Sequence, residues 1–296
     1  MYYRRKVILS LLEQFGGELD KISFQKLLFL LAQKQEKPAF DFVPYKKGCF
    51  SFQSYADIRT MIKYGMISEN IEKDDWIKTD NNYYTSTLSV KDKQVLSYIK
   101  NQFENSSSDD LISFTYKRYP YYATKSTIAH KVLNKAELIK VQETIPKNTS
   151  TILYTIGYEG VSLENYLNKL IRNDVKLLCD VRKNSLSMKY GFSKSQLQNA
   201  CENLDIYYVH IPDLGISSDK RQSLNSQNDY DRLFKEYEKT TLISENKAIY
   251  NVLELLKKHK RIALTCFEAN HCQCHRGTLA KAIIRLPEWK YELKHL

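Results

Sequence analysis

An apolar run at residues 262–267 leads directly into the most reactive stretch of this chain. Within nine residues of its end stand two imidazoles, three thiols, a carboxylate and a guanidinium: Cys266, Glu268, His271, Cys272, Cys274, His275 and Arg276. Apolar residues then recur at helical spacing, at positions 279, 282 and 283. In open α/β sheets, ligands bind where strands end and helix N–H groups face them. Clustered titratable groups at such a point predict a functional site.

Three further apolar runs precede this one, at residues 152–156, 176–182 and 207–211. Amphipathic helical patterns separate them, around residues 162–170, 193–204, 230–240 and 246–258. Strands and helices that alternate at this spacing predict an α/β domain with a parallel sheet and right-handed crossovers. We expect this domain to cover residues 151–296.

Polar groups follow the predicted strands and should meet at one edge of the sheet. They are Gly157, Tyr158 and Glu159 after the first strand, Asp180 and Arg182 after the second, and His210 in the third. A parallel sheet brings such ends together although they are distant in sequence. The flexible Gly157–Gly160 turn lacks the dinucleotide-binding glycine pattern and indicates only anion binding at a helix N-terminus.

These residue types allow several chemistries. Arg182 and Arg276 suit phosphate or carboxylate, and we expect both to line one anion pocket together with Gly157, Tyr158, Glu159 and His210. The candidate catalytic residues are Cys266, Glu268, Cys274, His275 and Asp180. Cys274 stands at a predicted helix start, where the helix dipole and Arg276 should lower the pKa of its thiol. The alternative for Asp180 and Arg182 is a simple ion pair.

The C-terminal half resembles domain-of-unknown-function family 488. The resemblance rests on five motifs in order and spacing: residues 155–159, 180–182, 191–193, 208–215 and 266–276 with its Cys-Phe-Glu and Cys-His-Arg elements. It implies a Rossmann-like α/β domain and no established reaction. His271 and Cys272 lie outside the family pattern.

Zinc is a competing use of the same cysteines. Cys266, Cys272, Cys274 and His275 offer enough ligand atoms, yet the paired Cys-x2–4-Cys knuckles of structural sites are absent. Neighbouring Cys274 and His275 would also point apart unless the loop kinks. The sequence therefore assigns no metal ligands and leaves the cofactor open.

The N-terminal half, residues 1–145, is predicted to be a mainly helical binding module. Helical stripes around residues 7–15, 23–35 and 52–62 precede two short strands expected within residues 76–85. Three helices and a hairpin resemble a winged helix, and residues 25–29, 48–51 and 57–59 loosely resemble Panacea-type antitoxin domains. A helical dimerisation or docking module is the alternative. The polar, proline-containing residues 143–150 predict a linker.

Charge favours a polyanionic partner for this chain. The net charge is +11 with a pI near 9.1, which is typical of proteins that bind nucleic acid. Lys117, Arg118 and Tyr119 lie in a stretch that interleaves basic and aromatic residues and could contact DNA, although packing of these tyrosines is the alternative. Six unevenly spaced cysteines suit a reducing cytoplasm, and no apolar run is long enough to span a membrane.

Three functions follow as hypotheses. The first is a DNA-associated enzyme that acts on a phosphate-bearing nucleotide or nucleic acid at the sheet edge. The second is a non-catalytic sensor that binds a nucleotide-like molecule or modified DNA, and the third is an antitoxin-like interaction protein. Oligomers are compatible with each.

Overall fold

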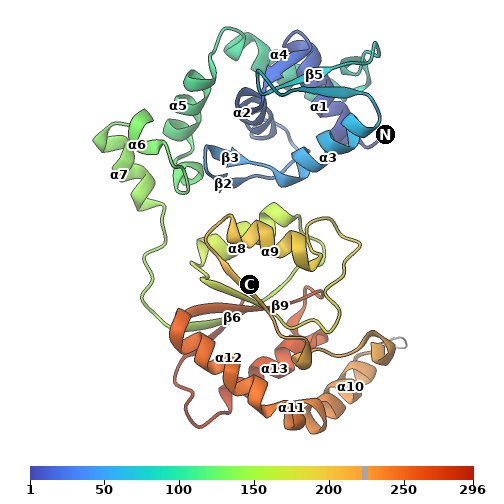
Figure 1. Cartoon of the computed structure of the whole chain (residues 1–296), viewed down its shortest axis with the longest axis vertical. Helices are drawn as coiled ribbons and strands as arrows, with labels where there is room; N and C mark the ends of the chain where they lie inside the picture. The colour runs from blue at the N-terminus through green and yellow to red at the C-terminus, as the bar shows by residue number, and fades with distance from the viewer. Residues whose placement is uncertain (222–225) are drawn as a thin grey trace. The chain divides into compact units, whose positions relative to one another are not determined.

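The structure is a computed structural model that describes residues 1–221 and 226–296. The chain forms two compact units, Met1–Ile145 and Pro146–Leu296, each with its own hydrophobic core (Figure 1). The division falls inside the polar stretch at residues 143–150.

The C-terminal unit is built on a five-stranded, fully parallel sheet. Its strands are β6 (Ile152–Gly157), β7 (Leu177–Asp180), β8 (Tyr207–His210), β9 (Arg261–Cys266) and β10 (Glu292–His295). Their order is β10-β6-β9-β7-β8, so β9 runs between β6 and β7. Every residue of β6, β7 and β9 is buried, as expected for strands that are covered on both faces. The predicted α/β fold is confirmed.

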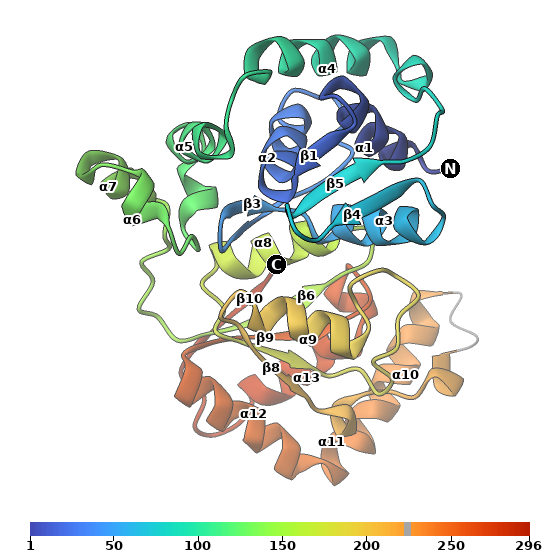
Figure 2. The ribbon, with the colours of Figure 1, turned by 45° about the horizontal axis from the view of Figure 1, so that its top comes forward.

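Helices cover both faces of this sheet (Figures 1 and 2). One face carries α8 (Leu163–Arg172) and α9 (Lys194–Glu202), and the other carries α12 (Asn246–His259) and α13 (His275–Ile284). Helices α10 (Gln227–Lys239) and α11 (Thr241–Ser244) connect β8 to α12. Helix α8 begins because the Ser162 hydroxyl accepts a hydrogen bond from the Asn165 amide, and it buries residues 163, 166, 167 and 170 along one stripe.

Two local features of this unit do not follow from the sequence pattern. Helix α9 begins without a side-chain cap: the Ser193 hydroxyl bonds to Ser187, and the Gln196 side chain accepts from the Gly191 amide. The edge strand β10 was missed because its residues are mostly exposed and carry no apolar pattern. It forms because β6 leaves an open edge, to which β10 adds in parallel.

The N-terminal unit is mainly helical with two small sheets. Its elements are α1 (Tyr3–Gln14), β1 (Glu18–Asp20), α2 (Lys21–Ala32), β2 (Val43–Tyr45), β3 (Gly48–Phe50), α3 (Phe52–Lys63), β4 (Ile67–Asn70), β5 (Asp75–Lys78), α4 (Val90–Phe103), α5 (Ser108–Arg118), α6 (Ala129–Val132) and α7 (Lys135–Glu143). Strands β1, β5 and β4 form an antiparallel sheet in that order, and β2 pairs with β3.

Of the two strands predicted within residues 76–85, only the first is present, as β5, and it pairs with the preceding strand β4. The actual hairpin is β4–β5, and its turn contains Asp74 in the left-handed region at φ 60°. Residues 79–84 form no strand. Helix α2 begins at Lys21, two residues before the predicted stripe, because the Asp20 side chain accepts the capping hydrogen bonds from residues 22 and 23.

Gln25 and Lys26 attach α2 to the β2–β3 hairpin. The Gln25 side chain accepts from the Ser51 amide and donates to the Ser54 hydroxyl, and the Lys26 ammonium donates to the carbonyls of Lys47 and Cys49. Burial lowers the pKa of Lys26. Gln25 and Lys26, which belong to the stretch that resembles antitoxin domains, therefore have a structural role in packing α2 against the hairpin.

Within the described ranges, none of the helices combines the length and apolar composition that a bilayer crossing requires.

Candidate functional site

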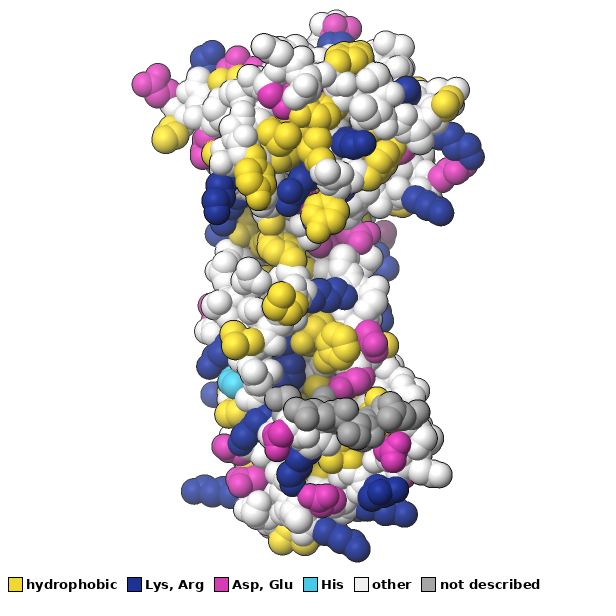
Figure 3. Space-filling model, turned by 90° about the vertical axis from the view of Figure 1, so that its right-hand side faces the viewer, with side chains coloured by type: hydrophobic (Ala, Val, Ile, Leu, Met, Phe, Trp, Pro, Cys, Tyr) yellow, Lys and Arg dark blue, Asp and Glu magenta, His cyan; other side chains and the backbone are white. Residues whose placement is uncertain are grey.

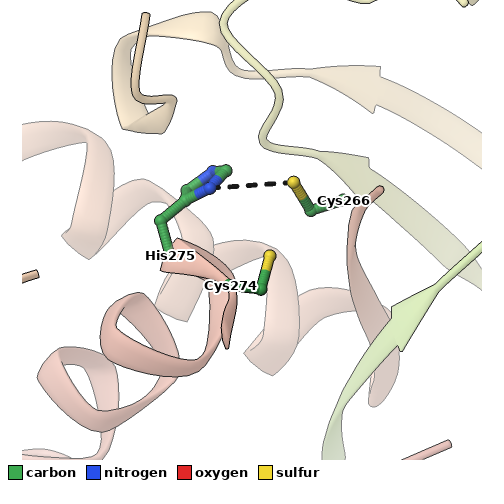
Figure 4. A group of neighbouring side chains, drawn as sticks. All are labelled: Cys266, Cys274 and His275. Carbon is green, nitrogen blue, oxygen red and sulfur yellow. Dashed lines mark hydrogen bonds between the residues drawn. The ribbon is translucent and has the colours of Figure 1, made fainter. Parts of the chain in front are cut away.

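The end of β9 and the start of α13 bring two thiols and an imidazole together (Figure 4). Cys266 is the last residue of β9, Cys274 is the N-cap of α13, and His275 is its first residue. One ligand-type atom from each lies within 4.8 Å of the others, and all three side chains are buried. The Cys266 sulfur is 3.7 Å from the His275 Nδ1 atom and 3.3 Å from a Glu268 carboxylate oxygen.

The backbone fixes the tautomer of His275. Its Nε2 atom lies 2.9 Å from the Val181 carbonyl oxygen, which only accepts hydrogen bonds, so Nε2 carries the proton. The other ring nitrogen, Nδ1, faces the Cys266 sulfur (Figure 4) and carries a lone pair whenever the ring is neutral.

The expectation of a lowered pKa at Cys274 was wrong. Burial raises the pKa of this thiol, and the neighbouring Cys266 and Glu268 add to the rise, which outweighs the opposing effect of Arg276. Cys274 is only 1% exposed, so a thiolate at this helix N-terminus would not be solvated by water. Cys272, by contrast, is exposed and lies apart from this group.

Asp180 and Arg182 form a buried ion pair at the end of β7. The guanidinium donates to both Asp180 carboxylate oxygens, at 2.8 and 2.5 Å, and also to the Tyr158 hydroxyl and the Phe192 carbonyl. Tyr208 donates to the same carboxylate at 2.6 Å. Burial acts to lower the pKa of Arg182, but the bonds and charge of Asp180 raise it overall. The simple ion pair, left open by the sequence, is therefore present.

Arg276 braces the loop that follows Cys266. Arg276 is 1% exposed, and its guanidinium donates to the carbonyls of Glu268 and Ala269, at 2.5 and 2.8 Å. Glu159 holds the same loop by accepting from the Ala269 amide. Gly157 lets the loop pass, because a Cβ atom there would lie 1.9 Å from the Glu268 carbonyl oxygen.

A cavity of about 330 Å³ opens onto the cluster. Cys266, Glu268, His275, Tyr158 and Arg182 line it, together with residues that the sequence analysis did not single out: Lys183, Asn184, Leu186, Ser187, Met188, Ile216 and Phe267. Arg276 is not among the lining residues. His210 bonds to the Arg182 carbonyl oxygen instead, with its Nε2 atom at 2.8 Å.

Two residues of the site that were not predicted, Phe267 and Tyr208, could have been found from the sequence. Phe267 ends the apolar run yet is 43% exposed, and its ring packs edge-on against Tyr158. Tyr208 lies two residues before His210, and the two-residue period of a strand places both on one face.

The cluster supports two kinds of chemistry. A thiol beside a neutral imidazole can transfer its proton and become a nucleophile. Two sulfurs and a nitrogen that converge are also a ligand set for a soft metal ion.

The basic stretch proposed for nucleic acid lies at the end of α5. Lys117 and Arg118 are exposed, and Lys117 pairs with Glu137 at 3.5 Å. Tyr119 packs edge-on against Phe29, with ring centroids 5.0 Å apart.

The C-terminal unit is thus a parallel α/β domain with a buried Cys-Cys-His cluster at the carboxyl end of its sheet. Residues 162–283, within the C-terminal half of the chain, match the model of the family described as domain of unknown function DUF488. The match begins after β6 and includes Asp180, Arg182 and the whole cluster. No curated protein and no solved structure matches the chain.

Proposed function

We propose that this chain is a DNA-associated enzyme whose DUF488 domain binds and acts on a phosphate-bearing nucleotide or nucleic acid. The observation that carries the proposal is the Cys266–His275 contact, with Nδ1 aimed at the sulfur, on the wall of a cavity. Reactive groups and an open cavity at the carboxyl end of a parallel sheet are the usual setting of catalysis in this fold class.

The lining of the cavity favours a nucleotide. Phe267 offers a half-exposed ring for a base, and Lys183 offers an exposed ammonium for a phosphate. The guanidinium of Arg182 is committed to protein acceptors, so we assign it to positioning Tyr158 and the loop at residues 183–192, not to direct anion binding.

The N-terminal unit supports the DNA part of the proposal. Its order is α1-β1-α2-β2-β3-α3-β4-β5, and the sheet order β1-β5-β4 makes β4–β5 comparable to a two-stranded wing after three helices, with the β2–β3 hairpin inserted between α2 and α3. In this arrangement α3 would enter the major groove, and its Arg59 and Lys63 are exposed. On the face drawn in Figure 3, basic and acidic side chains are interspersed. The DNA-binding surface must therefore be located by mutation of individual residues.

The catalytic part is tested by incubating the full chain with a panel of nucleotides and short DNA. Bound ligand and product are then followed by equilibrium binding and mass spectrometry. We expect turnover that Cys266→Ser abolishes and that Cys272→Ser, a change at an exposed thiol of the same loop, preserves. Binding without turnover would favour the sensor hypothesis. Neither binding nor turnover, with the fold intact, would contradict both.

The DNA part is tested by the salt dependence of duplex binding. Phosphate contacts release counterions, so affinity should fall steeply as salt rises. Neutralising Arg59 and Lys63 to glutamine should weaken binding and flatten this slope. The matched double change at Lys117 and Arg118 tests the alternative surface. Absence of binding at low salt would favour a protein-docking module.

A further inference from the structure

We propose that Cys266, Cys274 and His275 hold one zinc-like metal ion whose fourth coordination position opens to the cavity. The inference deepens the proposed function, on which it rests only for the substrate that would reach the open position.

The spacing of the donor atoms fits a tetrahedral ion. Zinc–sulfur and zinc–nitrogen bonds of about 2.3 and 2.0–2.1 Å place neighbouring ligand atoms roughly 3.5–3.8 Å apart in a tetrahedron. The Cys266 sulfur and His275 Nδ1 are 3.7 Å apart, and none of the three ligand atoms is more than 4.8 Å from another. Side-chain adjustments of about 1 Å would therefore close the site.

The local backbone solves the difficulty of adjacent ligands. Cys274 is extended, at φ −135° and ψ 137°, and His275 begins the helix directly after it. The turn between these conformations sends both side chains toward Cys266 (Figure 4). Gly277 allows the preceding turn to pack closely, because a Cβ atom there would lie 2.3 Å from the His271 carbonyl oxygen.

His275 already has the outer partner that metal-binding histidines need. Its Nε2–H donates to the Val181 carbonyl, which orients the ring and leaves Nδ1 as the ligand atom. The imidazole is fully buried, so the ring is held before any ion binds.

The composition of the site selects the metal and its role. Two thiols and an imidazole favour zinc over magnesium or calcium, which take oxygen ligands. Three protein ligands with an open fourth position characterise catalytic zinc, whereas structural sites use four. Cys266 and His275 line the cavity, and Glu268 lies beside Cys266 at 3.3 Å, so the open position would face both the cavity and this carboxylate.

The test begins with the full chain purified without chelators and with its thiols reduced. We expect about one zinc per chain by elemental mass spectrometry. X-ray absorption should show two sulfur ligands at about 2.3 Å and nitrogen or oxygen at about 2.0–2.1 Å. Cobalt(II) put in place of zinc should give thiolate charge-transfer bands and tetrahedral d–d bands.

Variants separate this site from adventitious binding. Cys266→Ser and His275→Ala should weaken cobalt binding at least about tenfold, since each removes a ligand. Cys272→Ser, which changes an exposed thiol two residues from Cys274, should bind as the wild type does. Circular dichroism of each variant controls for folding. If a variant does not fold, the absorption spectra of the wild-type protein still test whether sulfur binds the metal.

The proposal is overturned if neither the isolated nor the reconstituted protein holds stoichiometric metal, or if the bound metal has no sulfur ligand. Equal affinity in Cys266→Ser and wild type would overturn it as well. Metal binding is measured without substrate, so its failure leaves the proposed activity to be judged separately. Turnover by metal-free protein would retain the function and remove the metal.

Discussion

The Arg182 guanidinium forms two hydrogen bonds to the carboxylate of Asp180, at the end of β7 beside the Cys-Cys-His cluster. Asp180 is fully buried and Arg182 is 5% exposed. Tyr158, which follows β6, Tyr208 in β8 and Phe192 in the loop before α9 also bond to this pair, so it connects β6, β7 and β8 to that loop. The pair therefore holds the walls of the cavity in place.

Replacing Asp180 with asparagine should lower the free energy of unfolding by about 3–5 kcal/mol, because the buried guanidinium of Arg182 would lose its counter-charge. Urea denaturation measures the change. The control is Glu254→Gln, which breaks the exposed ion pair with Lys257 and should cost no more than about 1 kcal/mol. Similar losses in both variants would mean that the buried pair has no special structural role.

Gly157→Ala should displace the loop that follows Cys266. The new Cβ atom would lie 1.9 Å from the Glu268 carbonyl oxygen, so backbone must move, at a cost of about 1–3 kcal/mol or more. Gly65→Ala is the comparison, because that site has open space and only the strain of φ +68°, about 1–2 kcal/mol. Ligand binding should suffer in the first variant alone. Unchanged binding in Gly157→Ala would separate the loop from the site.

Iodoacetamide should label Cys272 first under native conditions. Cys272 is exposed, whereas Cys266 and Cys274 are each 1% exposed and Cys179 and Cys201 are fully buried. Reactivity requires an accessible thiolate, and burial raises the pKa of Cys179, Cys201 and Cys274. Peptide mass spectrometry over time gives the order, and Cys272→Ser should remove the fast phase. Fast labelling of Cys274 would show that the loop opens in solution.

Tyr116 should make the N-terminal unit sensitive to alkali. Burial raises the pKa of its phenol to about 12, against the opposing effect of the Ser126 hydrogen bond. Since the folded-state pKa lies above the ordinary value of 10.0, this contribution is present below pH 10 and is lost as pH rises toward 12. The loss amounts to about 2–3 kcal/mol.

Denaturation of the wild type and of Tyr116→Phe across this pH range measures the effect. The variant should lose less stability between pH 10 and 12, although it starts lower because the hydrogen bond to Ser126 is gone. Parallel curves would place the alkaline sensitivity in other tyrosines of the N-terminal unit, such as Tyr55, whose pKa burial also raises.

The pattern of apolar residues was enough to predict strands β6, β7, β8 and β9 of the sheet. Apolar runs at β6, β7 and β9 had to be buried, and the amphipathic helices between them had to cover the two faces. Parallel connection then brought residues around 157, 180 and 266 to one edge, because strand ends of one direction lie together. The spacing of apolar residues along the chain predicts both the strands and helices and the faces that they bury, because apolar side chains are excluded from water.

How the charged and reactive groups at that edge are used depends on contacts between residues that are far apart in the sequence. Arg276 was expected to bind an anion, but its guanidinium donates to two carbonyls of the loop. The thiol of Cys274 was expected to be acidic, but packing buries it beside Cys266. The hydrogen-bond partner of His275, the carbonyl of Val181, lies just after β7 and 94 residues away in the sequence. No local pattern records such a partner, because the acceptor is a backbone carbonyl that every residue type possesses.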